Sequence, residues 1–133
     1  MSVPVSERSD NKFEVILKAR HLAAYTLRVT SNVNIFKEEY YKAITQDIVK
    51  LGKDIYIHLW DANNCDLRTE SEDRLKYQKQ ALRECHDLLA TIQLAQPIFH
   101  LRTKRIEYWG DMIVEVRNLI RAWIISDRKR IGK

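Results

Sequence analysis

The chain has 133 residues, of which 45% are hydrophobic and 31% charged, and its formal net charge is +5. This length and composition predict a single domain with one hydrophobic core. No apolar run reaches the roughly 18 residues of a transmembrane helix, and residues 1–12 lack the apolar segment of a signal peptide. Two cysteines are too few for a disulfide framework, so we expect a cytoplasmic protein.

Residues 1–11 are polar and offer nothing to bury, which predicts a disordered or loosely docked N-terminal tail. We expect the folded domain to span residues 12–130, followed by a short basic tail at 131–133. The first helix is predicted from Lys12 to Thr30, because apolar residues recur there at helical spacing. Its inward stripe consists of Phe13, Ile16, Leu17, Ala23, Ala24 and Leu27. Residues 31–34, Ser-Asn-Val-Asn, then end the helix.

A second helix is predicted from Phe36 to Ala62, with an apolar stripe that keeps helical spacing throughout. Tyr41, Val49, Tyr56 and Trp60 widen that stripe. The extra width indicates contact with more than one neighbouring helix, or with another subunit. Gly52 lies in the apolar band, where glycine lowers helix propensity by up to about 1 kcal/mol, so we expect a close helix crossing there.

The residues from Thr69 to Glu72 have the Ser/Thr-x-x-Glu form of a capping box, which predicts the start of a third helix. Pro97 should end that helix, because proline lacks the backbone donor. We expect residues 98–102 to form a turn and Thr103 to cap a fourth helix. Four amphipathic helices with short connections predict an all-α, up-down-up-down four-helix bundle.

The sequence contains no Glu-x-x-His pair, no His-x-x-x-His, no Cys-x-x-Cys and no glycine-rich phosphate loop,. Asp54, His58 and Asp61 have helical spacing, but such sets usually form a solvated or hydrogen-bonded face. Cys85 and His86 are adjacent, so they point about 100° apart on a helix and cannot form a simple thiolate–imidazole pair. We therefore expect a protein without catalysis, cofactor or metal.

Several polar and aromatic residues fall on or beside the apolar stripes. Arg20, Asp47 and Arg117 are expected at the stripe edge, with packed stems and solvated heads. An alternative is an ion pair between Asp47 and Arg117 inside the bundle, which would fix the register of two helices. The three tryptophans are expected in the core, although aromatic residues beside arginine are also typical of interfaces. These are Trp60, Trp109 and Trp123.

The excess positive charge lies at the C-terminal end, where residues 102–133 hold nine Lys/Arg and four Asp/Glu. Arg102, Lys104 and Arg105 begin the fourth helix, where positive charge opposes the helix dipole and suggests another use. At its C-terminal end the dipole favours cations, which here are Arg128, Lys129, Arg130 and Lys133. On the third helix, Lys76, Lys79 and Arg83 form a stripe that we expect to be a solvated face. There Glu72 can pair with Lys76, and Asp87 with Arg83.

Several of these segments together resemble the Avd family, the accessory variability determinants of diversity-generating retroelements. The resemblance covers roughly residues 13–130 and is carried by diffuse patterns. Its segments are Lys18–Leu27, Leu51–Asp66, Thr103, Arg117–Ile124 and Asp127–Arg130.

The resemblance implies a barrel-like homopentamer with a basic surface that binds a reverse transcriptase and its template-repeat RNA, and possibly cDNA. Such a complex performs error-prone cDNA synthesis in mutagenic retrohoming. The basic residues at matching positions, Arg117, Arg121, Arg128, Lys129 and Arg130, become candidates for contact with RNA or polymerase.

Two alternatives stay open. Four-helix bundle proteins encoded in ribosomal RNA intervening sequences share this architecture, but their usual Arg-Arg-Ala-x-x-Ile-Pro-x-Asn-type second helix has no match between Phe36 and Ala62. The other alternative is a structural oligomerisation module without a nucleic-acid role.

Overall fold

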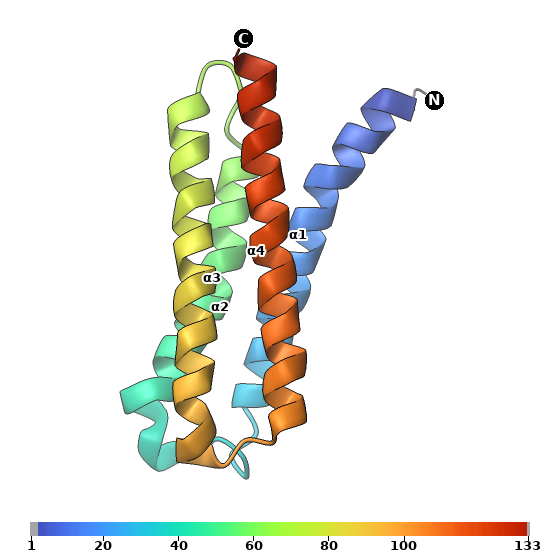
Figure 1. The fold of residues 1–133 in the computed structure, drawn as a ribbon. Coiled ribbons are helices and arrows are strands. Elements are labelled where there is room, and N and C mark those ends of the chain that lie inside the picture. The colour runs from blue at the N-terminus through green and yellow to red at the C-terminus, as the bar shows by residue number, and fades with distance from the viewer. Residues whose placement is uncertain (1–2, 133) are drawn as a thin grey trace.

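The computed structural model describes residues 3–132, with side chains from residue 14 onward. Within this range the chain forms four long α-helices: α1 (Val3–Thr30), α2 (Gln46–Asn63), α3 (Ser71–Phe99) and α4 (Thr103–Ile131). Each helix packs against the next, and α1 also packs against α4 (Figure 1). This arrangement confirms the predicted all-α class and is consistent with an up-down bundle. None of the described helices combines the length and apolarity needed to cross a membrane.

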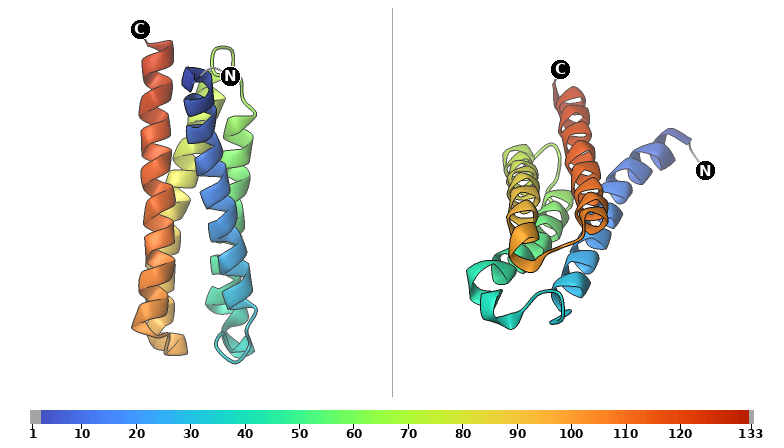
Figure 2. Two further views of the ribbon diagram at one scale, coloured as in Figure 1. Left: turned by 90° about the vertical axis from the view of Figure 1, so that its right-hand side faces the viewer. Right: turned by 60° about the horizontal axis from the view of Figure 1, so that its bottom comes forward.

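The first helix begins at Val3, well before the predicted start at Lys12. Pro4 lies in its first turn, where backbone N–H groups have no partner within the helix, so proline does not interrupt it. The opening turns of α1 lead away from the other three helices (Figures 1 and 2). Residues 1, 2 and 133 lie outside the described part of the chain, and so does the side chain of Phe13. The division into a domain and two tails therefore stays a prediction.

The predicted helix from Phe36 to Ala62 is wrong in its first third. A 3₁₀ turn, η1 (Glu38–Tyr40), and a π-helical turn, η2 (Tyr41–Thr45), precede α2. Phe36 is buried ahead of them and packs against Phe99, with ring centroids 4.6 Å apart. The neighbouring residues Ile44 and Thr45 of this π turn are both buried. Regular helical spacing therefore continues in the sequence across a segment that is not α-helical.

The predicted capping box is also wrong. Helix α3 begins at Ser71, and no side-chain hydrogen bond caps it. Instead, the carboxylate of Asp66 accepts hydrogen bonds from the backbone N–H groups of Arg68 and Thr69 and from the Thr69 hydroxyl, at 2.9–3.0 Å. The backbone N–H of Asp66 in turn donates to the Glu70 carboxylate at 2.7 Å. Thr69 thus closes a turn centred on Asp66 instead of capping the helix.

Pro97 does not end α3, which continues to Phe99. The helix ends at His100, whose left-handed backbone (φ 55°) lets the N–H of Leu101 donate to the carbonyl of Gln96 at 3.0 Å,. Thr103 is likewise not a cap, because Arg102 occupies the N-cap position without a side-chain bond and Thr103 is the first helical residue.

The close crossing predicted at Gly52 is confirmed. A Cβ atom at Gly52 would lie 2.9 Å from Cγ2 of Thr26 on α1. The hydroxyl of Thr26 also accepts a hydrogen bond from Nε1 of Trp109 on α4 at 3.1 Å. Trp109 and Trp123 are buried as predicted, whereas Trp60 is 48% exposed, so its predicted place in the core is wrong. Its ring lies on the outside of α2, 6.2 Å from Tyr56.

Candidate nucleic-acid interface

The eight basic residues predicted from the sequence occupy three separate places on α4 and its N-cap. One group lies at the start of the helix, one at its end, and one along the side that faces α3. Lys104 and Arg128 are about 36 Å apart along the axis, at 1.5 Å per residue. The eight residues therefore do not form one patch. In order, the groups are Arg102, Lys104 and Arg105; Lys129 and Arg130; and Arg117, Arg121 and Arg128.

At the start of α4, part of the positive charge takes part in helix packing. Nη1 of Arg105 donates to the hydroxyl of Tyr25 on α1, at 3.4 Å. The Tyr25 ring packs edge-on against Tyr108 and Trp109, with centroids 5.2 and 5.7 Å away. Arg105 is accordingly half-buried, whereas the Arg102 side chain is exposed to solvent.

The middle group meets basic residues of α3. Nη2 of Arg121 lies 3.5 Å from Nε2 of His86. Because residues three, four or seven positions apart share a helix face, Arg117 and Arg128 lie on the same side of α4 as Arg121. By the same spacing, the α3 residues on the side of His86 are Lys76, Lys79 and Arg83.

Helices α3 and α4 run antiparallel beside each other (Figure 1). The contact between Arg121 and His86 therefore joins the two basic stripes into one surface. We call this surface the basic face, and its side chains are exposed except for the half-buried Arg117. The sequence showed each stripe separately and gave no sign that they are neighbours. The basic face consists of Lys76, Lys79, Arg83, His86, Arg117, Arg121 and Arg128.

Two carboxylates of α3 face α2, next to the basic stripe of the same helix. Glu84 and Asp87 line a groove of about 780 Å³ between α2 and α3, together with Asp47 and Asp54 of α2. On the basic side, Glu72 lies at the end of the stripe, beside Lys76 and Lys79. Neither Glu72–Lys76 nor Asp87–Arg83 is among the ion pairs of the described side chains. The acidic groove therefore borders the basic face along α3, and Gln80 lines both.

The Asp54, His58 and Asp61 set is divided among other partners. Asp54 accepts a hydrogen bond from Lys50 at 2.7 Å. Nδ1 of His58 lies 2.8 Å from the buried carboxylate of Glu84, and its ring stacks on Tyr77. Among the residues that the structure describes, no group of three His, Cys, Asp or Glu could hold a metal ion.

Neither cysteine is prepared to act as a nucleophile. Burial raises the pKa of Cys85 to about 12, so its thiol stays protonated at neutral pH and packs as an apolar group,. Desolvation also raises the pKa of the half-buried Cys65. Both residues are free thiols.

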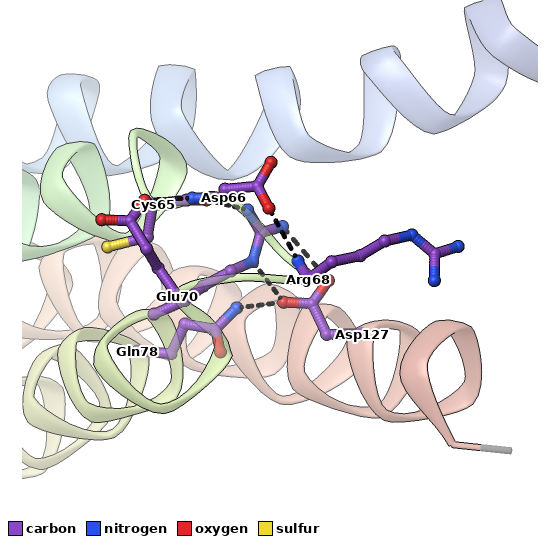
Figure 3. A network of polar contacts seen from close by, with 7 residues as sticks. Cys65, Asp66, Arg68, Glu70, Gln78 and Asp127 are labelled. Atoms are coloured by element: carbon purple, nitrogen blue, oxygen red, sulfur yellow. Dashed lines mark hydrogen bonds and ion pairs between the residues drawn. The ribbon is translucent and has the colours of Figure 1, made fainter.

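A buried polar network fixes the C-terminal end of α4 against α3 (Figure 3). The guanidinium of Arg74 donates to both carboxylate oxygens of Asp127, at 2.7 and 3.1 Å, and Gln78 donates to the same carboxylate at 2.9 Å. Arg74 also donates to the carbonyl of Cys65 at 3.1 Å, and its guanidinium lies 5.0 Å from the ring centre of Trp123. This network holds the helix end that carries Arg128, Lys129 and Arg130.

The alternative Asp47–Arg117 pair does not form. Asp47 is exposed beside the α2–α3 groove, and Nε of Arg117 donates to the side-chain oxygen of Asn118 at 3.4 Å. The buried pair between Arg74 and Asp127 was missed, although Arg74, Gln78 and Ala81 do have helical spacing. That spacing could have placed Arg74 and Gln78 inside the bundle, but both are polar residues, which are usually expected at the surface.

Comparison with known proteins identified no relative of this chain. No protein-family model, no curated protein sequence and no solved structure matches this chain.

Proposed function

We propose that this protein is a non-catalytic accessory protein that binds RNA through the basic face. The observation that supports the proposal is the contact between Arg121 and His86, which joins the basic stripes of α3 and α4. Neutralising phosphates with Lys and Arg releases counterions and supplies most of the affinity in sequence-independent binding. Contacts of this kind position a nucleic acid without reading its sequence.

The test removes two cations from each helix of the basic face. The variants are Lys79→Gln/Arg83→Gln and Arg121→Gln/Arg128→Gln, and a matched control, Lys42→Gln/Lys53→Gln, removes two exposed cations near or on α2. Affinity for an RNA is measured by fluorescence anisotropy at two salt concentrations. Each lost phosphate contact should reduce the slope of log K against log salt by about 0.7–0.9. If the control weakens binding as much as the other variants, the basic face is not the site.

By its resemblance to Avd, we further propose that the protein works as a cyclic homo-oligomer, pentameric in that family. In this role it would hold a reverse transcriptase and template RNA during mutagenic cDNA synthesis and retrohoming. Co-expression with a reverse transcriptase encoded beside its gene should give a complex that co-purifies at low salt. Independent elution of the two proteins would count against this role.

One observation favours a second candidate, a structural oligomerisation module without a nucleic-acid role. Trp60 and Ile57 are each 48% exposed on the outside of α2, and Tyr56 lies beside them. Exposed apolar surface of this kind often marks contact with another protein surface. This candidate predicts self-association that does not change when the basic face is neutralised.

A further inference from the structure

We infer that the RNA bound by the basic face is double-stranded. This inference rests on the proposed function and specifies its ligand. Its basis is the arrangement of the cations, which belong to two helices and lie in two rows. The α3 row is Lys76, Lys79 and Arg83, and the α4 row is Arg117, Arg121 and Arg128.

The two rows can face two lines of phosphates. At 1.5 Å per residue, the α3 row is about 10 Å long and the α4 row about 16 Å long. The contact between Arg121 and His86 places the two rows on neighbouring, packed helices. A single strand presents one line of phosphates. A duplex presents two lines across a groove, and double-stranded RNA is bound largely by its shape and through phosphate and 2′-hydroxyl contacts.

Apart from His86, the exposed aromatic side chains of the described residues lie outside the basic face. Proteins that bind single strands without sequence preference stack successive bases on aromatic rings. Here Tyr108 is exposed on the side of α4 that faces α1, where it packs against Tyr25. Tyr40, Tyr41 and Trp60 lie on or just before α2. Half-buried leucines flank the α3 row and pack on the core: Leu75, Leu82 and Leu89.

The experiment compares two labelled RNAs with the full chain. One is a duplex of about 20 base pairs, longer than the roughly 16 that a double-stranded-RNA-binding domain spans. The other is an unstructured oligouridine of the same length. Titrations by fluorescence anisotropy are made at about 50 and 200 mM salt. We expect at least about tenfold tighter binding of the duplex, with a steeper salt dependence because both rows contact phosphates.

The variants Lys79→Gln/Arg83→Gln and Arg121→Gln/Arg128→Gln test the rows separately. Each should reduce the salt slope for the duplex by about 1.4–1.8, whereas Tyr108→Ala should leave duplex binding unchanged. If the single strand binds as tightly as the duplex, or if only one row affects duplex binding, the inference is wrong while the proposed function stands. If the row variants bind both RNAs like the Lys42→Gln/Lys53→Gln control, the proposed function itself fails.

Discussion

Gly52 and Gly110 are both helical glycines, but only Gly110 has room for a methyl group. A Cβ at Gly52 would meet Thr26 at 2.9 and 3.1 Å, whereas one at Gly110 would meet only Leu89, at 3.5 Å. Gly110→Ala should therefore stabilise the protein by up to about 1 kcal/mol through helix propensity. Gly52→Ala should destabilise it by about 1–2 kcal/mol, because forcing apart packed groups exceeds that gain. Urea denaturation of both variants measures the two changes.

A second substitution checks the cause at Gly52. Thr26→Ser removes the methyl group that lies closest while keeping the hydroxyl that accepts from Trp109. Combined with Gly52→Ala, it should recover part of the lost stability. A Gly52→Ala variant as stable as Gly110→Ala would show that the two helices separate without cost.

The carboxyl group of Asp66 should make the stability of the turn before α3 depend on pH. Hydrogen bonds from the backbone N–H of Thr69, then from its hydroxyl and from the N–H of Arg68, lower the pKa of Asp66. A carboxyl group whose pKa is lower in the folded state stabilises the fold above its unfolded pKa, near 3.9. That contribution is lost as the pH falls through the folded pKa. The stability difference between wild type and Asp66→Ala should therefore be largest near neutral pH and shrink below about pH 4. Denaturation midpoints that differ equally at every pH would contradict this.

At the scale of the elements, the pair between Arg74 and Asp127 joins α3 to α4. Their side chains are only 3% and 7% exposed. Asp127→Ala should cost about 3–5 kcal/mol, because it leaves the Arg74 charge buried without its carboxylate partner. The double variant Arg74→Met/Asp127→Leu should recover most of that loss, since an apolar replacement removes both charges. Thermal or urea unfolding of the single and double variants gives the comparison.

A surface pair provides the control. Lys18 and Glu115 join α1 to α4 at 3.3 Å, but their side chains are 42% and 49% exposed. Removing Glu115 should cost at most about 1 kcal/mol, because solvent screens the interaction. Equal losses from Glu115→Ala and Asp127→Ala would mean that burial does not determine the energy of these pairs.

Helical periodicity predicted the number and order of the helices and most of their buried faces, but not every interior position and not the helix ends. On α1, Leu27 was expected inside and is 37% exposed, whereas Leu22 is fully buried. On α3, Arg74 and Gln78 occupy interior positions, while Leu75 is only half-buried. Residue type alone could not identify the interior positions of Arg74 and Gln78, because their burial depends on hydrogen bonds to Asp127 of another helix,.

The helix ends depended on interactions that spacing does not encode. Pro97 lies in the last turn of α3, and the left-handed backbone of His100 ends that helix. The candidate site was predictable in part. Each basic stripe follows from its own helical spacing, whereas their meeting depends on the register between α3 and α4, which the contact of Arg121 with His86 reveals.

At the scale of the whole molecule, the basic face and the exposed pair Ile57 and Trp60 lie on different helices. The basic face belongs to α3 and α4, the acidic groove to α2 and α3, and the exposed Ile57 and Trp60 to α2. Because these surfaces are separate, RNA binding and self-association should be separable by mutation. A protein that bound RNA and its own copies through one surface would lose both together.

Self-association tests this separation. Burial of the apolar surface on α2 should favour an oligomer at tens of micromolar, with a mass that is a multiple of 15.8 kDa,. Ile57→Lys/Trp60→Gln should shift the mass measured by light scattering to that of the monomer without unfolding the bundle, since both side chains are half exposed. Arg121→Gln/Arg128→Gln should leave the mass unchanged. A wild-type mass near 15.8 kDa would refute self-association, and dissociation by the arginine variant would place the interface on the basic face instead.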